Sequence, residues 1–150
     1  MTVTAIRHTG IVVSNMETSL PFYRDLLGLE IWWDQIEEGP VVEAVSGVPG
    51  ARVHTIKLKA PDGVSIELLE YLNTPKPVPP LSNANDVGCS HIALQVSDLD
   101  SLYRKAVVAG IRFNTPPAVA AGGKAKVTYC RDPEGVYLEL VQILGYRFIL

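Results

Sequence analysis

Hydrophobic positions along this chain fall into short runs typical of β-strands, with two stretches spaced as in an amphipathic helix. In the first half, a helix is expected between Leu20 and Leu27. Pro21 is tolerated only in a first helical turn, so Thr18 or Ser19 is the expected N-cap. The strands expected in this half cover residues 3–13, 29–34, 52–59 and 64–71, with a loop over 35–50 that can include one short helical turn.

The same order of elements returns after a proline-rich segment. Residues 73–87 contain four prolines and no periodic apolar pattern, so an extended linker is expected there. Beyond it, Asp98 is the expected N-cap of a helix that ends at Gly110. The strands expected in this half cover residues 89–96, 111–114, 124–131 and 136–144. We therefore divide one domain into module one (3–72), the linker (73–87), module two (88–144) and a tail (145–150).

Fixed offsets in residue number show that the two modules are copies of one unit. The segment Val13–Met16 recurs in similar form at Val96–Leu99, and the offset of that match equals the offset from His8 to His91 (91 − 8 = 83). The offset from Glu67 to Glu139 is smaller (139 − 67 = 72). The two offsets differ by 83 − 72 = 11, so the first copy has 11 more residues than the second between its histidine and its glutamate. The extra residues are most simply placed in the loop after the second strand of the first copy. The expected fold is α+β, with two βαβββ modules that form a curved mixed sheet around a metal site.

Composition narrows the class of protein. With 47% hydrophobic and 19% charged residues, the chain is typical of a globular protein and unlike a disordered one. A net charge of −3 and the lack of Lys or Arg runs argue against a nucleic-acid partner. No apolar run reaches membrane-spanning length, and the N-terminus does not resemble a signal peptide, so a cytoplasmic protein is expected.

The repeat duplicates a pair of residues with metal-binding chemistry. Each module has a histidine near the start of its first strand and a glutamate in the middle of its last strand. The last strand is apolar, so an unpaired carboxylate there would cost free energy. A single such histidine is more often a hydrogen-bonded core residue, and a single such glutamate can pair with a basic residue or face solvent. Duplication of both favours a metal site with the ligands His8, Glu67, His91 and Glu139. Two imidazoles and two carboxylates suit Zn, Ni, Co or Mn, with Fe less favoured.

Two further residues, Glu70 and His54, also have side chains that can bind metal, but neither is expected to be a ligand. Glu70 shares the strand of Glu67, but residues three apart on a strand face opposite sides, and its counterpart is Gln142. His54 has Lys126 as its counterpart, so we interpret it as a pocket or surface residue.

Three segments carry a resemblance to a known family: 22–29 (Phe-Tyr-Arg-Asp-Leu-Leu-Gly-Leu), 91–94 (His-Ile-Ala-Leu) and 132–135 (Asp-Pro-Glu-Gly). Together with the module layout, they resemble the vicinal oxygen chelate superfamily, which includes glyoxalase I, methylmalonyl-CoA epimerase, extradiol dioxygenases and fosfomycin or bleomycin resistance proteins. A four-ligand set is what glyoxalase I and the epimerases imply. Extradiol dioxygenases imply two histidines and one carboxylate on iron, which would leave Glu67 surplus.

The resemblance implies a metal-dependent isomerase, epimerase or lyase that removes a proton next to a carbonyl or thioester, with a metal-stabilised enolate. The segment 39–43 resembles the epimerase segment that supplies a catalytic glutamate, so Glu43 and Glu139 are the candidate bases, with a solvated loop carboxylate as the open alternative for Glu43. The implied substrate is an acyl-CoA thioester or a hemithioacetal. The alternatives are an iron dioxygenase and a metal-free binding or resistance protein. The apolar tail is expected to pack on the body or on a second subunit, and a homodimer is expected.

Overall fold

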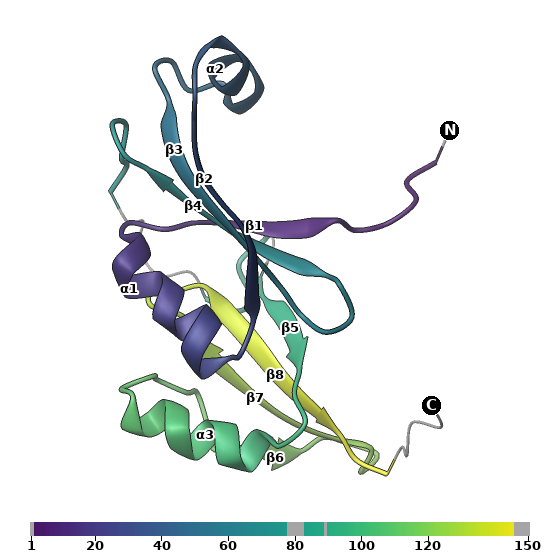
Figure 1. Cartoon of the computed structure of the whole chain (residues 1–150). Helices are drawn as coiled ribbons and strands as arrows, with labels where there is room; N and C mark the ends of the chain where they lie inside the picture. The colour runs from purple at the N-terminus through teal and green to yellow at the C-terminus, as the bar shows by residue number, and fades with distance from the viewer. Residues whose placement is uncertain (1, 78–82, 89, 146–150) are drawn as a thin grey trace. The chain divides into compact units, whose positions relative to one another are not determined.

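The computed structural model describes residues 2–77, 83–88 and 90–145. The chain divides into two compact units, Met1–Pro79 and Pro80–Leu150, which are described separately below (Figure 1). Most of the apolar tail whose packing the sequence predicts, residues 146–150, lies outside the described residues. No helix among the described residues is long and apolar enough to cross a membrane.

The first unit is a four-stranded sheet with its helices at one face and one end. Its elements are β1 (His8–Val12), α1 (Met16–Pro21), the π-helical turn η1 (Phe22–Leu26), β2 (Glu30–Glu38), α2 (Pro40–Ser46), β3 (Arg52–Lys59) and β4 (Ser65–Tyr71). The strand order is β1-β4-β3-β2, with β1 parallel to β4 and the other pairs antiparallel.

The second unit repeats this plan on a smaller scale. Its elements are β5 (Ile92–Gln95), α3 (Leu99–Val108), β6 (Ala118–Val119), β7 (Ala125–Arg131) and β8 (Tyr137–Ile143). The strand order is β5-β8-β7-β6, again with the first strand parallel to the last and the other pairs antiparallel.

Strand registers reproduce the offsets found in the sequence. Gly10 lies opposite Glu67 between β1 and β4, and Ala93 lies opposite Glu139 between β5 and β8. The first members of these two pairs differ by 93 − 10 = 83 and the second members by 139 − 67 = 72, as the repeat requires. The prediction of two βαβββ modules is therefore confirmed at the level of individual residue pairs.

The helix in each unit begins in the same way. Asn15 accepts a hydrogen bond from the Thr18 N–H, and Asp98 accepts one from the Ser101 N–H, so both side chains act as N-caps. The expected N-cap at Thr18 or Ser19 was therefore wrong. The true start at Met16 places Pro21 at the end of α1.

Pro21 explains the turn that follows. Proline has no N–H to continue the α-helical ladder, and the next turn is π-helical, with the Leu27 N–H donating to the Phe22 carbonyl. Phe22 and Tyr23 in this turn are buried. The wider turn thus keeps two large aromatic side chains in the core after the ladder is interrupted.

Two expected strand positions were also wrong. Strand β2 does not end at residue 34 but continues to Glu38, because it pairs with β3 as far as Arg52. The short helical turn allowed for in this loop is helix α2. In the second unit, residues 111–114 form only an isolated bridge, between Phe113 and Cys130. Pro116 and Pro117 follow it, lack N–H donors and interrupt the ladder before β6.

Each unit has its own apolar core. In the first unit, Leu58 and Leu68 have no exposed surface, and Ile56 is almost as deeply buried. In the second, Leu138 has no exposed surface and Leu140 is 1% exposed. Leu68 and Leu140 are repeat counterparts (140 − 68 = 72), so the copies bury the same position.

Candidate metal centre

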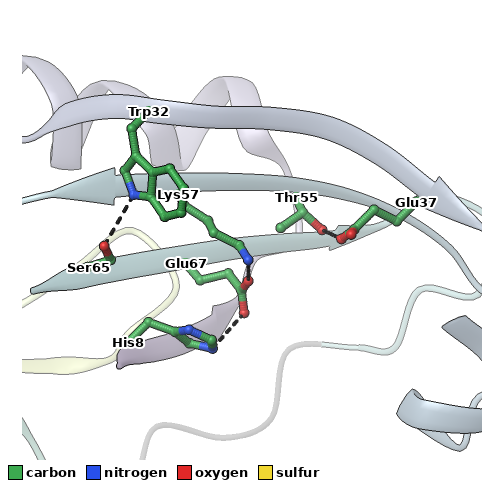
Figure 2. Close-up of polar contacts among 7 residues, drawn as sticks. All are labelled: His8, Trp32, Glu37, Thr55, Lys57, Ser65 and Glu67. Carbon is green, nitrogen blue, oxygen red and sulfur yellow. Dashed lines mark hydrogen bonds and ion pairs between the residues drawn. The ribbon is translucent and has the colours of Figure 1, made fainter. Parts of the chain in front are cut away.

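The first unit brings two of the predicted ligands into contact. His8 begins β1, and Glu67 lies in the neighbouring strand β4, two positions along on the same face. The imidazole Nε2 of His8 is 3.2 Å from the carboxylate Oε2 of Glu67 (Figure 2). One ring nitrogen of the histidine therefore points at one carboxylate oxygen.

Lys57 holds the other oxygen of the same carboxylate. It lies directly opposite Glu67 on β3, and its Nζ is 3.0 Å from Glu67 Oε1 (Figure 2). The side chains of Lys57 and Glu67 are only 18% and 13% exposed, so solvent screens this ion pair less than a surface pair. His8, Glu67 and Lys57 thus form a row across three neighbouring strands.

Aromatic and polar side chains continue this face of the sheet. The indole N–H of Trp32 donates to Ser65 Oγ at 3.2 Å, and the Trp32 and Trp33 ring centroids lie 6.0 and 5.7 Å from Lys57 Nζ. Farther along β3, the Thr55 hydroxyl donates to Glu37 Oε2 at 2.7 Å (Figure 2).

The second unit has an equivalent pair with a different neighbour. His91 Nε2 is 3.4 Å from Glu139 Oε2. The residue opposite Glu139 on β7 is Tyr129, whose hydroxyl is 3.4 Å from His91 Nε2. Ser90 Oγ lies 2.7 Å from His91 Nδ1. In the tautomer with its proton on Nδ1, His91 donates to Ser90 and presents the Nε2 lone pair to a ligand.

Burial and charge shift two pKa values on β7. Desolvation, and then the nearby Glu139 carboxylate, raise the pKa of Tyr129, so the phenol keeps its proton beside the pair. Burial, with a smaller contribution from Asp132, raises the pKa of Cys130 to about 12. Cys130 is therefore an unreactive core thiol on the opposite face of the strand from Tyr129.

Comparison with known proteins decides the family. The sequence of residues 5–140 matches the family described as the Glyoxalase/Bleomycin resistance protein/Dioxygenase superfamily. The chain belongs to this superfamily.

Relatives of this superfamily member include two lyases. A probable lactoylglutathione lyase from Synechocystis sp. is 30% identical over 135 residues, covering 90% of this chain and 92% of the relative. The lactoylglutathione lyase of Schizosaccharomyces pombe is 26% identical over 144 residues. That match covers 91% of this chain but only 46% of the yeast protein, so the chain spans about half of that relative. A glyoxalase family protein from Bacillus cereus shares the fold, with a TM-score of 0.88, 22% identity and 97% coverage of both chains.

The donor atoms of this superfamily member fit a divalent ion. Ligand atoms about 2.1 Å from one ion are about 3.0 Å apart at octahedral angles and about 3.4 Å apart at tetrahedral angles. The N···O separations of 3.2 and 3.4 Å in the two pairs lie in this range. Lys57 occupies Oε1 of Glu67 and leaves Oε2 for one metal bond. No group of three or more His, Cys, Asp or Glu residues close enough to hold an ion is present in the described part of the chain.

The remaining predicted site residues have other positions. Glu43 lies in α2, beyond the end of β2 and away from β1 (Figure 1). The β3 residue at that end, Arg52, is five positions from Lys57, or about 17 Å along the strand. The first unit therefore does not bring Glu43 to its His8–Glu67 pair.

Glu70 and His54 have structural partners. The Met16 N–H donates to Glu70 Oε2 at 3.2 Å, and in the second unit the Leu99 N–H donates to Gln142 Oε1 at 2.9 Å. Glu70 and Gln142 thus anchor equivalent helix N-termini. His54 Nε2 lies 2.7 Å from Asp34 Oδ1 on the adjacent strand.

Sequence reasoning missed the direct contact of Lys57 with the site. A signal for it exists, because Lys57 precedes Glu67 by the same interval as Tyr129 precedes Glu139. The Ser90 contact and the Thr55–Glu37 pair carry no comparable signal, since neither follows the repeat in the sequence.

Proposed function

We propose that this chain is a divalent-metal-dependent isomerase or lyase that removes a proton from carbon next to a carbonyl or thioester. The observation that carries the proposal is the repeated His–Glu contact, with ring nitrogen and carboxylate oxygen 3.2 and 3.4 Å apart in the two units. A buried hydrogen bond could explain one such pair, but two pairs at equivalent positions support a shared role in holding an ion.

The names of the relatives favour the glyoxalase type of this reaction. A probable lactoylglutathione lyase is 30% identical over nearly all of both chains. We therefore place a hemithioacetal first among the proposed substrates and an acyl-CoA thioester second. A transfer of the proton to the neighbouring carbon would give the glyoxalase outcome, and its return to the opposite face would give epimerisation.

In the proposed mechanism, His8, Glu67, His91 and Glu139 would hold a Zn, Ni, Co or Mn ion. When bound, the ion supplies Lewis-acid stabilisation of the negative charge that develops on substrate oxygen. Lys57 keeps Glu67 in one orientation by binding its second oxygen, and Ser90 fixes the ring of His91. Glu139 takes the proton from the substrate carbon and returns it. We prefer Glu139 to Glu43 because Glu139 belongs to a His–Glu pair, whereas Glu43 lies away from the pair of its own unit.

Metal titration tests the ligand set. We expect about one ion per chain, and an affinity reduced at least about tenfold by each of His8→Ala, Glu67→Gln, His91→Ala and Glu139→Gln, because each variant weakens or removes a ligand. The measurement is calorimetric titration of chelator-treated protein with Zn²⁺, with metal content checked by mass spectrometry.

Two matched controls accompany the titration. Glu70→Gln is on the same strand as Glu67 but keeps an acceptor for the Met16 N–H, as Gln142 does for Leu99. His54→Gln removes the third histidine. Both should bind Zn²⁺ as the wild type does. Unchanged affinity in all four ligand variants would contradict the proposal.

One observation favours a second candidate function, metal-free binding of a small molecule. Lys57 already compensates the charge of Glu67, so that carboxylate has a stable partner without an ion. A protein that bound no ion in the titration, yet retained small-molecule binding, would establish this candidate instead.

We also propose that the protein is a homodimer, supported by the apolar composition of residues 143–150. Sedimentation equilibrium should give twice the mass of one chain. Truncation after Gly145 should weaken the dimer at least about tenfold if the tail contributes apolar contact. A monomer at micromolar concentration in the full-length chain would contradict this assignment.

A further inference from the structure

Lys57 retains unused capacity to bind an anion. An ammonium group has three N–H donors, and Glu67 Oε1 accounts for one of them. The side chain is mostly buried but still 18% exposed, on the face of the sheet that carries His8 and Glu67 (Figure 2). A partly desolvated cation of this kind binds an anionic oxygen more strongly than a fully hydrated one.

A β-bulge places two tryptophans next to this cation. Successive residues of a regular strand face opposite sides, but the pairing of β2 with β3 shifts between Ile31 and Trp33. Both indole rings consequently lie within about 6 Å of Lys57 Nζ. Trp32 and Trp33 are 45% and 36% exposed, and the Trp32 N–H is held by Ser65. Two accessible aromatic surfaces therefore flank the ammonium group.

The second unit has no cation at the equivalent position. Tyr129 takes the place of Lys57, and a tyrosine side chain carries no positive charge. The two His–Glu pairs are thus alike, but their neighbours differ in charge. This difference in charge suits recognition of a ligand that is charged at one end.

We propose that Lys57, Trp32 and Trp33 form a subsite for the carboxylate of the substrate, with the apolar part next to that carboxylate lying on the indole rings. The inference rests on the proposed function and deepens it, because it makes the substrate a carboxylic acid whose non-reacting end binds beside the His8–Glu67 pair. Lys57 acts here as a specificity-determining residue.

Tryptophan fluorescence provides a direct test, because Trp32 and Trp33 are the only two tryptophans in the chain. The probe is phenylacetate, compared with neutral phenylacetamide, titrated into chelator-treated protein. We expect saturable quenching by the acid and at least about tenfold weaker binding of the amide, since a charge-assisted hydrogen bond is lost. Equal binding of acid and amide by the wild type would overturn the proposal without any variant.

Variants of Lys57 identify the cation responsible. Lys57→Gln should bind the acid at least about tenfold more weakly and lose the preference over the amide, whereas Lys57→Arg should keep that preference. Lys59→Gln is the matched control, because Lys59 lies two positions along the same face but is 47% exposed. A Lys57→Gln variant that folds and still prefers the acid would overturn the proposal. If that variant does not fold, the indole N–H signals of the wild type must both shift with the acid and not with the amide, or the proposal fails.

The two proposals fail separately. The fluorescence titration uses metal-free protein and an unreactive acid, so its result does not depend on turnover or on the ion. Acid preference without Zn²⁺ binding would overturn the proposed function alone. Zn²⁺ binding without acid preference would overturn the subsite alone.

Discussion

Glu139→Gln is expected to lower kcat by about 10²–10⁴-fold at saturating metal, the range typical for loss of a general base. The glutamine keeps an oxygen donor but cannot accept the substrate proton. Glu67→Gln should lower kcat much less under the same conditions, because Glu67 is proposed only as a ligand and is paired with Lys57. The measurement is steady-state kinetics with hemithioacetal and acyl-CoA substrates, together with deuterium incorporation at the reacting carbon.

Glu43→Gln distinguishes the two candidate bases. If Glu139 is the base, this change in helix α2 should alter kcat by less than about threefold, because Glu43 is remote from the first unit's pair. A loss of kcat with Glu43→Gln as large as that expected for Glu139→Gln would transfer the role to Glu43. Equal losses in Glu67→Gln and Glu139→Gln would show that both act only as ligands.

Leu68→Ala and Leu140→Ala should each lower the free energy of unfolding by about 2–5 kcal/mol. Both side chains are fully or almost fully buried, at equivalent positions in the cores of the two units, so each change removes apolar contacts and leaves a cavity. Urea denaturation followed by circular dichroism measures the loss. Val107→Ala is the control, because Val107 is 47% exposed in helix α3 and should change stability by less than about 0.5 kcal/mol.

If either leucine variant lowers the free energy of unfolding by less than about 1 kcal/mol, the surrounding core must repack and fill the space of the missing atoms, so that no cavity remains. A large loss in one variant only would show that the two copies contribute unequally to stability, despite their equal burial.

The duplicated pattern made the main features of the fold and the two His–Glu contacts predictable. His8 and Glu67 could be placed on neighbouring strands because the same two residue types recur at His91 and Glu139 with the spacing of one structural unit. The alternation of sides along a strand separated Glu67 from Glu70, and the contact of Glu70 with the Met16 N–H agrees with that separation.

Elements without a periodic pattern were harder to predict. The second half of β2 is polar and mostly exposed, so its residues resemble a loop until pairing with β3 is known. The π-helical turn depends on how the chain accommodates Pro21, and single-residue patterns do not encode that response. Cross-strand contacts such as Lys57–Glu67 depend on register, which the sequence indicates only through its repeat.

The presence of both copies on one polypeptide has an evolutionary consequence. Two identical chains that each supplied one module would carry the same residue at both copies of every position, so any mutation would appear twice. In this fused chain, position 57 is a lysine while its counterpart, position 129, is a tyrosine. Glu70 and Gln142 have also diverged, yet both still accept a helix N–H. Because both modules lie on one chain, a residue beside the His–Glu pair can change in one module without changing in the other. The contacts that hold the helix N-termini are meanwhile kept in both modules.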